Sequence, residues 1–304
     1  MQKLTIHYIL YTASLLFFLS LFATGVNFFS TQYPGNNYFP PHTFFIGLIL
    51  LLIYTGCLIQ FGQTSIQASQ SKDLMLLLLV MSVIAFATNA AQYTPFKTID
   101  QSIINIEQSL HISVKAILSW SNHQPFLQKI LIFAYNSLLY QMAYIPLFLI
   151  MIKRRKEVHE YYFLLLFSAL IGFTFYYFFP TTAPASVITS PYFHAEQQAT
   201  GLKFMQIHQH IQPTTLEGGL IALPSFHVIW AWICVYSLRH WRIAVIALFP
   251  INLLIVLSCV LLGWHYPTDV LGALIVILLA HKAYHRITAP LLAPKLTYPV
   301  LSSS

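Results

Sequence analysis

The chain has 304 residues, of which 57% are hydrophobic and only 8% are charged, with a formal net charge of +7. Typical soluble domains carry about 25% charged residues, and a soluble fold of this length cannot bury so much apolar surface. The composition therefore excludes a soluble globular protein and predicts one that crosses a membrane several times.

Eight segments are apolar over about the 20 residues that a helix needs to cross a bilayer. The first lacks a small-residue cleavage site and is preceded only by Lys3, so we interpret it as a retained span rather than a signal peptide. The sixth is the shortest. Together they predict an all-α, polytopic helical bundle. In chain order the predicted spans are His7–Val26, Thr43–Gly62, Asp73–Gln92, Gln128–Ile152, Tyr161–Phe179, Leu223–Leu238, Ile243–Gly263 and Tyr266–His285.

Basic residues are divided unequally between the two sides of these spans. Eleven fall on the side of both termini, including the Lys153–Lys156 run, and four fall on the other side. The positive-inside rule then predicts cytoplasmic termini. We expect a bacterial inner (plasma) membrane, and this asymmetry explains the net charge without a nucleic-acid partner. The four basic residues on the other side are Lys97, Lys115, Lys129 and Lys203.

Two long connections lie on the side opposite the termini. Thr94–Leu127 spaces its apolar residues by three or four, as an amphipathic helix does. That helix lies either in the membrane interface or packed over the bundle. Pro180–Ala222 is polar and contains four prolines, which favours a plain linker or a loop that gates a site.

A histidine and a carboxylate stand at the start of the last span. Pro267 suits the first position of a helix, so His265 is expected just before the helix and Asp269 in its first turn, with the two side chains facing each other. An ionisable pair at membrane depth is costly and usually functional. A carboxylate fixes the tautomer of an imidazole whose other nitrogen attacks phosphorus. A structural hydrogen bond is the alternative.

A second histidine opens the sixth span on the same side. With Pro224 at the first helical position, Ser225 and His227 are expected in the first turn, where free N–H groups favour an anion. His227 is then a candidate proton donor to a leaving oxygen. Gly218 and Gly219 allow the loop to approach a ligand closely. The alternative is an ordinary helix with an interfacial histidine.

A third segment, Phe179–Pro184, ends the fifth span on the same side. Thr181 and Thr182 within it are candidate substrate-binding residues, together with Ser225, Pro224 and Gly219. The alternative is that the prolines of this segment only terminate the helix.

Pro-Ser-x-His followed by His-x3-Asp, each opening a span, resembles the type 2 phosphatidic acid phosphatase superfamily. Gly218–Ala231, Phe179–Pro184 and Gly263–Tyr266 are similar to its branch of inositol phosphorylceramide synthases. The resemblance implies a metal-free helical bundle in which His265 is the nucleophile, His227 the leaving-group acid and Asp269 the residue that orients His265. It implies a catalytic bundle over residues 73–285, two added spans in 1–72 and a cytoplasmic tail, 286–304.

The departures bear on the substrate. The Lys-x6-Arg-Pro motif of the phosphatases is not found, and Ser258-Cys259 stands where they carry Ser-Arg. A phosphomonoester dianion would be poorly neutralised without these cations, because charge stabilisation dominates phosphoryl transfer. The pattern therefore favours head-group transfer from a phosphodiester lipid, unless Lys203 or a lysine of 94–127 supplies the charge.

Other functions remain open. Within the superfamily, a lipid phosphate or polyprenyl-pyrophosphate phosphatase is the alternative. A transporter or a catalytically silent scaffold is the alternative of another class, but transport predicts polar residues near the midplane and internal repeats, which are not found. No cofactor is expected, and His227 and His265 have no third ligand at metal spacing.

Overall fold

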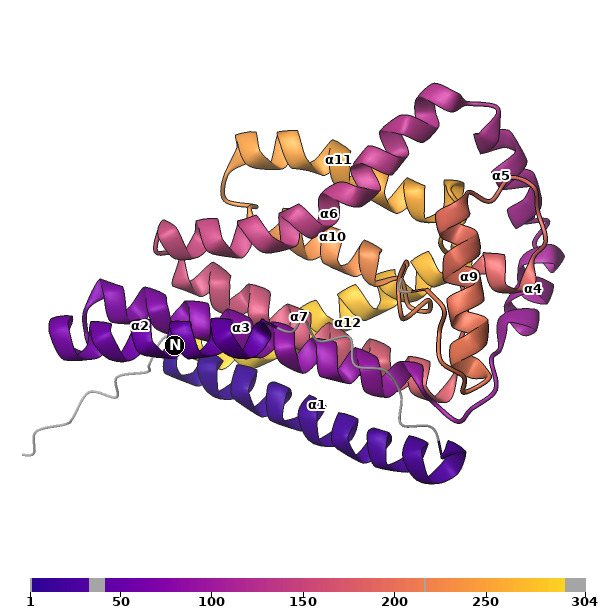
Figure 1. Cartoon of the computed structure of the whole chain (residues 1–304). Helices are drawn as coiled ribbons and strands as arrows, with labels where there is room; N and C mark the ends of the chain where they lie inside the picture. The colour runs from indigo at the N-terminus through magenta and orange to yellow at the C-terminus, as the bar shows by residue number, and fades with distance from the viewer. Residues whose placement is uncertain (1, 33–41, 216, 293–304) are drawn as a thin grey trace, which may run out of the picture.

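The computed structural model describes residues 2–32, 42–215 and 217–292, and in this part of the chain every regular element is a helix (Figure 1). Within these residues, seven helices are long and apolar enough to cross a membrane. The predicted all-α bundle is confirmed, and the chain is an integral membrane protein. The seven are α1 (Gln2–Thr31), α2 (Thr43–Phe61), α3 (Ile66–Gln92), α6 (Pro125–Met151), α7 (Arg155–Phe178), α11 (Arg242–Leu261) and α12 (Pro267–Leu292).

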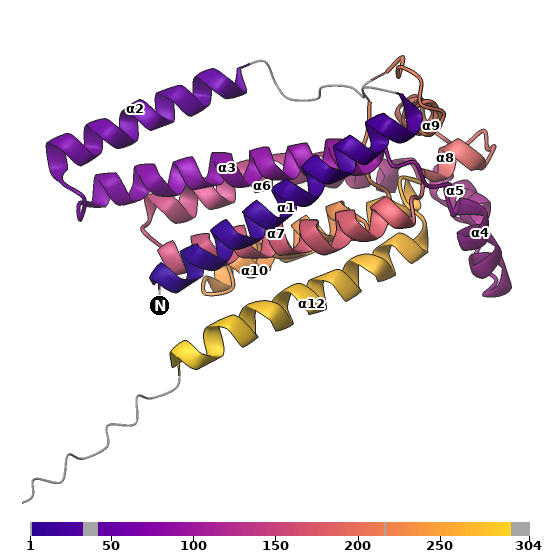
Figure 2. The ribbon, with the colours of Figure 1, turned by 90° about the horizontal axis from the view of Figure 1, so that it is seen from below.

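The shorter helices gather at one end of this bundle. Figure 2 shows α4 (Asp100–Ser109), α5 (Val114–Asn122), α8 (Pro184–Val187) and α9 (Ala195–His208) beyond the ends of the long helices. We call this the distal end. The start of α1 and the last described turn of α12 both lie at the opposite, terminal end. The first seven residues of the predicted 286–304 tail continue α12, and the others lie outside the described residues.

The sixth predicted span is shorter than expected. It forms α10 (Phe226–Ser237), which has 12 residues and so measures about 18 Å, well short of the roughly 30 Å of a hydrocarbon core. The distal half of this crossing is the loop before the helix, whose residues 221–225 are buried. Irregular backbone at membrane depth is tolerated where protein surrounds it.

Helix α7 occupies the centre of the bundle. In its most apolar stretch 61% of the residues are buried, whereas none are buried in the corresponding stretch of α2. Its neighbours are α1, α3, α6, α10 and α12. Helix α2 packs chiefly against α3, so it lies at the periphery. Helix α1 contacts both α3 and α7, and the Tyr177 hydroxyl donates to Asn27 Oδ1 at 2.8 Å. The N-terminal pair of spans is thus joined to the bundle through α1.

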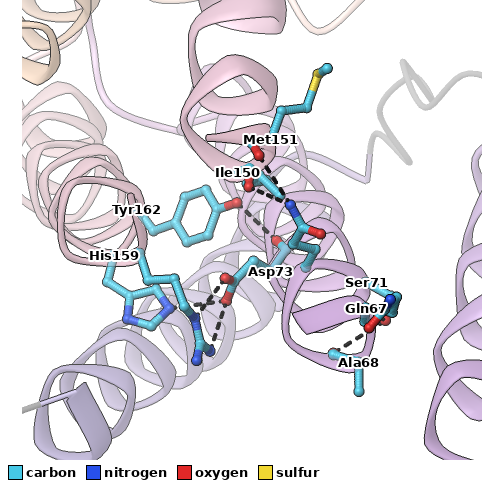
Figure 3. A network of polar contacts seen from close by, with 10 residues as sticks. Gln67, Ala68, Ser71, Asp73, Ile150, Met151, His159 and Tyr162 are labelled. Atoms are coloured by element: carbon cyan, nitrogen blue, oxygen red, sulfur yellow. Dashed lines mark hydrogen bonds and ion pairs between the residues drawn. The ribbon is translucent and has the colours of Figure 1, made fainter. Parts of the chain in front are cut away.

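A polar network joins α3 to α7 at the terminal end (Figure 3). Asp73, which is 1% exposed, accepts hydrogen bonds from Arg155 Nε at 3.0 Å and contacts His159 Nε2 at 3.1 Å. The Tyr162 hydroxyl donates to the Asp73 backbone carbonyl at 2.8 Å. A buried carboxylate is tolerated only when paired in this way. The basic residues at this end therefore bind helices together as well as marking a side of the membrane.

The two distal connections are more ordered than their sequences suggest. Thr94–Leu127 forms α4 and α5, and Ile103, Val114 and Leu118 pack with Tyr266 in a small core. The segment therefore packs over the bundle, as one of its two predicted arrangements requires. Pro180–Ala222 contains α8 and α9, so its prediction as a linker was wrong. The apolar residues of α9 have little helical periodicity, which hid the helix.

Candidate active site

The turn between α11 and α12 presents His265. Gly263 ends α11 with φ +78°, and a Cβ there would come within 2.7 Å of Leu118 and 2.8 Å of Phe193, so only glycine fits. The His265 N–H donates to the Cys259 carbonyl at 2.8 Å. The last turn of α11 thereby fixes the backbone that carries the histidine.

The predicted pairing of His265 with Asp269 is confirmed. Helix α12 begins at Pro267, and His265 Nδ1 lies 3.0 Å from Asp269 Oδ2. The same oxygen accepts the Tyr266 N–H at 3.1 Å, as the third residue of a helix does in a capping box. With Nδ1 carrying the proton, the carboxylate orients the ring and leaves Nε2 with its lone pair. Burial lowers the pKa of His265, an effect that the Ala222 carbonyl opposes.

His227 lies in the first turn of α10, but the helix begins later than predicted. Ser225 has extended backbone angles and forms the N-cap, so Pro224 precedes the helix instead of opening it. The Ser225 N–H donates to the Asp269 backbone carbonyl at 3.1 Å. Its hydroxyl donates to Cys259 Sγ at 3.8 Å, and its oxygen accepts no hydrogen bond from the free N–H groups of α10. Ser225 therefore joins the two histidine motifs.

His227 and His265 face a shared cavity. Their ring centroids lie 5.8 Å apart, and Gly219, Ala183 and Thr200 line the same space. Its volume of about 20 Å³ holds roughly one water molecule. A phosphate group therefore enters only if the surrounding loops move. Of the predicted substrate-binding residues, Gly219 reaches this cavity, whereas Pro224 and Ser225 are buried behind it.

An aromatic stack holds the ring of His227. Tyr135 of α6 stacks on His227 with centroids 4.3 Å apart and an interplanar angle of 17°. Its ring also stacks on Trp264 at 5.1 Å and 7°. Tyr135 was not predicted, because nothing in the sequence pattern of α6 separates it from the other aromatic residues of that helix.

Thr182 of the segment 179–184 is held by a buried acid. Asp100 of α4 accepts hydrogen bonds from Thr182 N–H at 2.9 Å and Thr182 Oγ1 at 2.9 Å. Burial raises the pKa of Asp100, and the bonds from Thr182 oppose that shift. Thr181 is fully buried as well. The cavity is lined by Ala183 instead of either threonine.

A second acid of α4 reaches the other motif. Glu107 Oε1 accepts from Thr268 N–H at 2.9 Å and from Thr268 Oγ1 at 2.8 Å, at the start of α12. Asp100 and Glu107 were not predicted from the sequence. A signal was present, because both lie on the face of α4 that carries buried Ile103, at spacings of three and four. Acids on the apolar face of a helix are expected to have buried partners.

Comparison with known proteins adds one finding. The sequence model of the PAP2 superfamily matches residues 101–283, which is more than half of the chain. The chain belongs to the PAP2 superfamily. No curated protein and no solved structure matches significantly. The match runs from α4 into α12 and includes both histidine motifs, and it supports a membrane enzyme of the phosphatase and phosphotransferase kind.

This PAP2 chain has one buried cation at the distal end of its described residues. Lys203 of α9 is 0% exposed, whereas Lys97, Lys115 and Lys129 are exposed. Its Nζ donates to the Gly218 carbonyl at 2.9 Å, beside cavity-lining Gly219. Burial lowers the pKa of Lys203 to about 8, an effect that the Glu217 carboxylate opposes.

The loop that carries this carbonyl packs tightly against α9. Gly218 has φ +73°, and a Cβ at that position would overlap the side chain of Thr200. Thr200 and Phe204, which flank Lys203 on α9, both line the cavity. The ammonium group of Lys203 therefore bonds to Gly218, the residue next to Gly219, which lines the cavity between the histidines. Within the described residues, no group of three His, Cys, Asp or Glu side chains is arranged to hold a metal ion.

Proposed function

We propose that the protein transfers a lipid-linked phosphate group through a phosphohistidine at His265, and that it favours head-group transfer from a phosphodiester lipid. The observation that carries the proposal is the contact of His265 Nδ1 with Asp269 at 3.0 Å, across a cavity from His227. A nucleophile, the group that orients it and a proton donor are the parts that covalent phosphoryl transfer needs.

The first half-reaction forms the covalent intermediate. His265 Nε2 attacks phosphorus and forms a P–N bond while the P–O bond to the lipid alcohol breaks. His227 gives its proton to the departing oxygen, and Asp269 stabilises the positive imidazole ring. In the second half-reaction an acceptor hydroxyl loses its proton to His227 and attacks phosphorus, which breaks the P–N bond and restores both histidines.

The charge around the cavity favours a singly charged phosphate. Asp100, Glu107 and Asp269 are buried carboxylates near the site, and Lys203 is the one buried lysine among the described residues of the distal end. Cys259 stands at the position where the resemblance places an arginine. A dianion would meet more repulsion than a phosphodiester in such surroundings, because interactions between buried charges are weakly screened.

Hydrolysis is the second candidate. The cavity has room for about one water molecule beside the two histidines, and water would then be the acceptor in the second half-reaction. A lipid phosphate or polyprenyl-pyrophosphate phosphatase would work in this way. The two candidates share the first half-reaction and differ only in what attacks the phosphohistidine.

We also propose the orientation. The excess of basic residues at the terminal end supports cytoplasmic termini and an extracytoplasmic site in a bacterial inner membrane. The substrate would then be a lipid of the outer leaflet.

The test is product analysis with purified protein in detergent. Phosphodiester lipid labelled in its phosphate is supplied with an alcohol acceptor, and phosphatidic acid is supplied separately. We expect labelled phosphate on the acceptor, little inorganic phosphate, and loss of turnover in His265→Ala. His285→Ala, which changes an exposed histidine at the terminal end of α12, is the matched control. Phosphate release without exchange would make the protein a phosphatase, and no turnover of either lipid would favour a scaffold or transporter.

A further inference from the structure

Helix α4 makes the same contact with two different segments of the site. Asp100 accepts the backbone N–H and the Oγ1 hydrogen of Thr182, and Glu107 accepts the same two groups of Thr268. Thr182 follows α7, whereas Thr268 lies in the first turn of α12. One short helix therefore holds two segments that are far apart in the sequence.

The spacing of Asp100 and Glu107 explains how one helix contacts both segments. Asp100 and Glu107 are seven residues apart, which is about two turns, so they share a face and are separated by roughly 10 Å along the axis. Each is only 2% exposed. Burying a carboxylate costs free energy unless the group is well hydrogen-bonded. Two buried carboxylates on one short helix therefore indicate that their hydrogen bonds serve a function.

Glu107 supplies a hydrogen-bond acceptor that the start of α12 lacks. The first N–H groups of a helix have no partner within the helix, and the residue before α12 is Tyr266, which has no capping side chain. Glu107 accepts the Thr268 N–H from outside the helix, and Asp269 accepts the Tyr266 N–H. The carboxylate oxygen of Asp269 that makes this bond also contacts His265.

We propose that Asp100 and Glu107 are positioning residues, with α4 acting as a brace that fixes the first turn of α12 and hence the angle between Asp269 and His265. The proposal rests on the function proposed above. Loss of the Glu107 contact frees the Thr268 N–H, loosens the first turn and lets Asp269 leave His265. Because neither acid of α4 lines the cavity, losing this contact should slow the chemical step and leave substrate binding unchanged.

The test compares Glu107→Leu, which removes the acceptor, with Glu107→Gln, which keeps an oxygen at the same place. We expect Glu107→Leu to lower kcat by about 10- to 100-fold, as for one or two hydrogen bonds to a charged group, with little change in KM. Glu107→Gln should recover most of this loss. Asp73→Asn removes a buried carboxylate at the terminal end and should leave kcat unchanged even if it lowers the melting temperature.

A partner substitution keeps the proposal testable if Glu107→Leu folds poorly. Thr268→Val removes the Oγ1 donor and should lower kcat, whereas Thr268→Ser should retain it. The double variant Glu107→Leu/Thr268→Val should lose less than the product of the two single losses, because both act through one contact. Independent, multiplicative losses would overturn the brace.

Amide hydrogen exchange separates the brace from the proposed chemistry. In the wild type the Thr268 amide should be protected, and Glu107→Leu should expose it while the Asp73→Asn variant does not. This readout needs no substrate. If exchange responds as expected but no variant, including the wild type, turns over lipid, the proposed function fails and the brace stands. An unchanged Thr268 amide in Glu107→Leu would overturn the brace itself.

Discussion

Replacing Lys203 by methionine should lower activity without lowering stability. The ammonium group is fully buried, and its pKa falls from 10.5 to about 8. At about 1.4 kcal/mol per pKa unit, burial disfavours the charged form by roughly 3 kcal/mol. Methionine removes this cost and loses the hydrogen bond to the Gly218 carbonyl, which contributes about 1–3 kcal/mol. The free energy of unfolding should therefore stay the same or rise slightly.

Activity should change in the opposite direction. A bound phosphate is expected to accept a charge-assisted bond from Lys203, and loss of such a bond costs about 1.5–3 kcal/mol, or roughly 10- to 100-fold in kcat/KM. Lys203→Gln keeps a donor for Gly218 without the charge and should be similarly impaired. Lys115→Met, at an exposed lysine of α5, is the control.

The pH dependence gives a second readout for the same residue. Because the folded-state pKa of Lys203 is lowered, its contribution to stability is present above the unfolded value of 10.5 and is lost as pH falls through about 8. Catalysis needs the protonated form, so activity should fall as pH rises through about 8. This fall of activity at alkaline pH should be absent in Lys203→Met. Full activity of that variant with the same fall at alkaline pH would refute the assignment of the lysine to phosphate binding.

Three further predictions follow from the site and the topology. Asp269→Asn should lower kcat strongly, since the neutral amide cannot stabilise the positive ring of His265, and steady-state kinetics with phosphodiester lipid measure this. Cys259→Arg should destabilise the protein by about 1–3 kcal/mol and gain no phosphatidic acid hydrolysis, because the position is fully buried and tightly packed; thermal unfolding and phosphate release test it. In a background without native cysteines, a cysteine replacing exposed Gln209 should react with impermeant thiol reagents in intact cells, whereas one replacing exposed Arg154 should not. A cysteine at Thr182 would not report the side of the membrane, because that position is buried.

The sequence was sufficient where a local rule determines geometry. Pro267 set the start of α12, and the spacing of four residues then placed Asp269 against His265. It was insufficient where packing decides. Proline preference put Pro224 in the first turn of α10, but contacts of Ser225 with Asp269 and Cys259 hold that residue as the N-cap.

The other site residues depend on contacts between distant segments. Lys203 was one of several lysines predicted to supply positive charge, but its burial depends on the packing of α9 against the loop that carries Gly218, which no periodic pattern in α9 indicates. Glu107 reaches Thr268 across 161 positions of sequence. The acids on the apolar face of α4 predicted burial, but their partners became visible only in the fold.

The central claim is that His265 carries the phosphate group during turnover. The direct measurement is to mix the protein with phosphate-labelled phosphodiester lipid, quench, and map the label by peptide mass spectrometry under alkaline conditions that preserve phosphohistidine. We predict one labelled peptide, modified at His265, that disappears on adding an alcohol acceptor and is absent in His265→Ala. Turnover with no label at His265, or with label on another residue, would contradict the account.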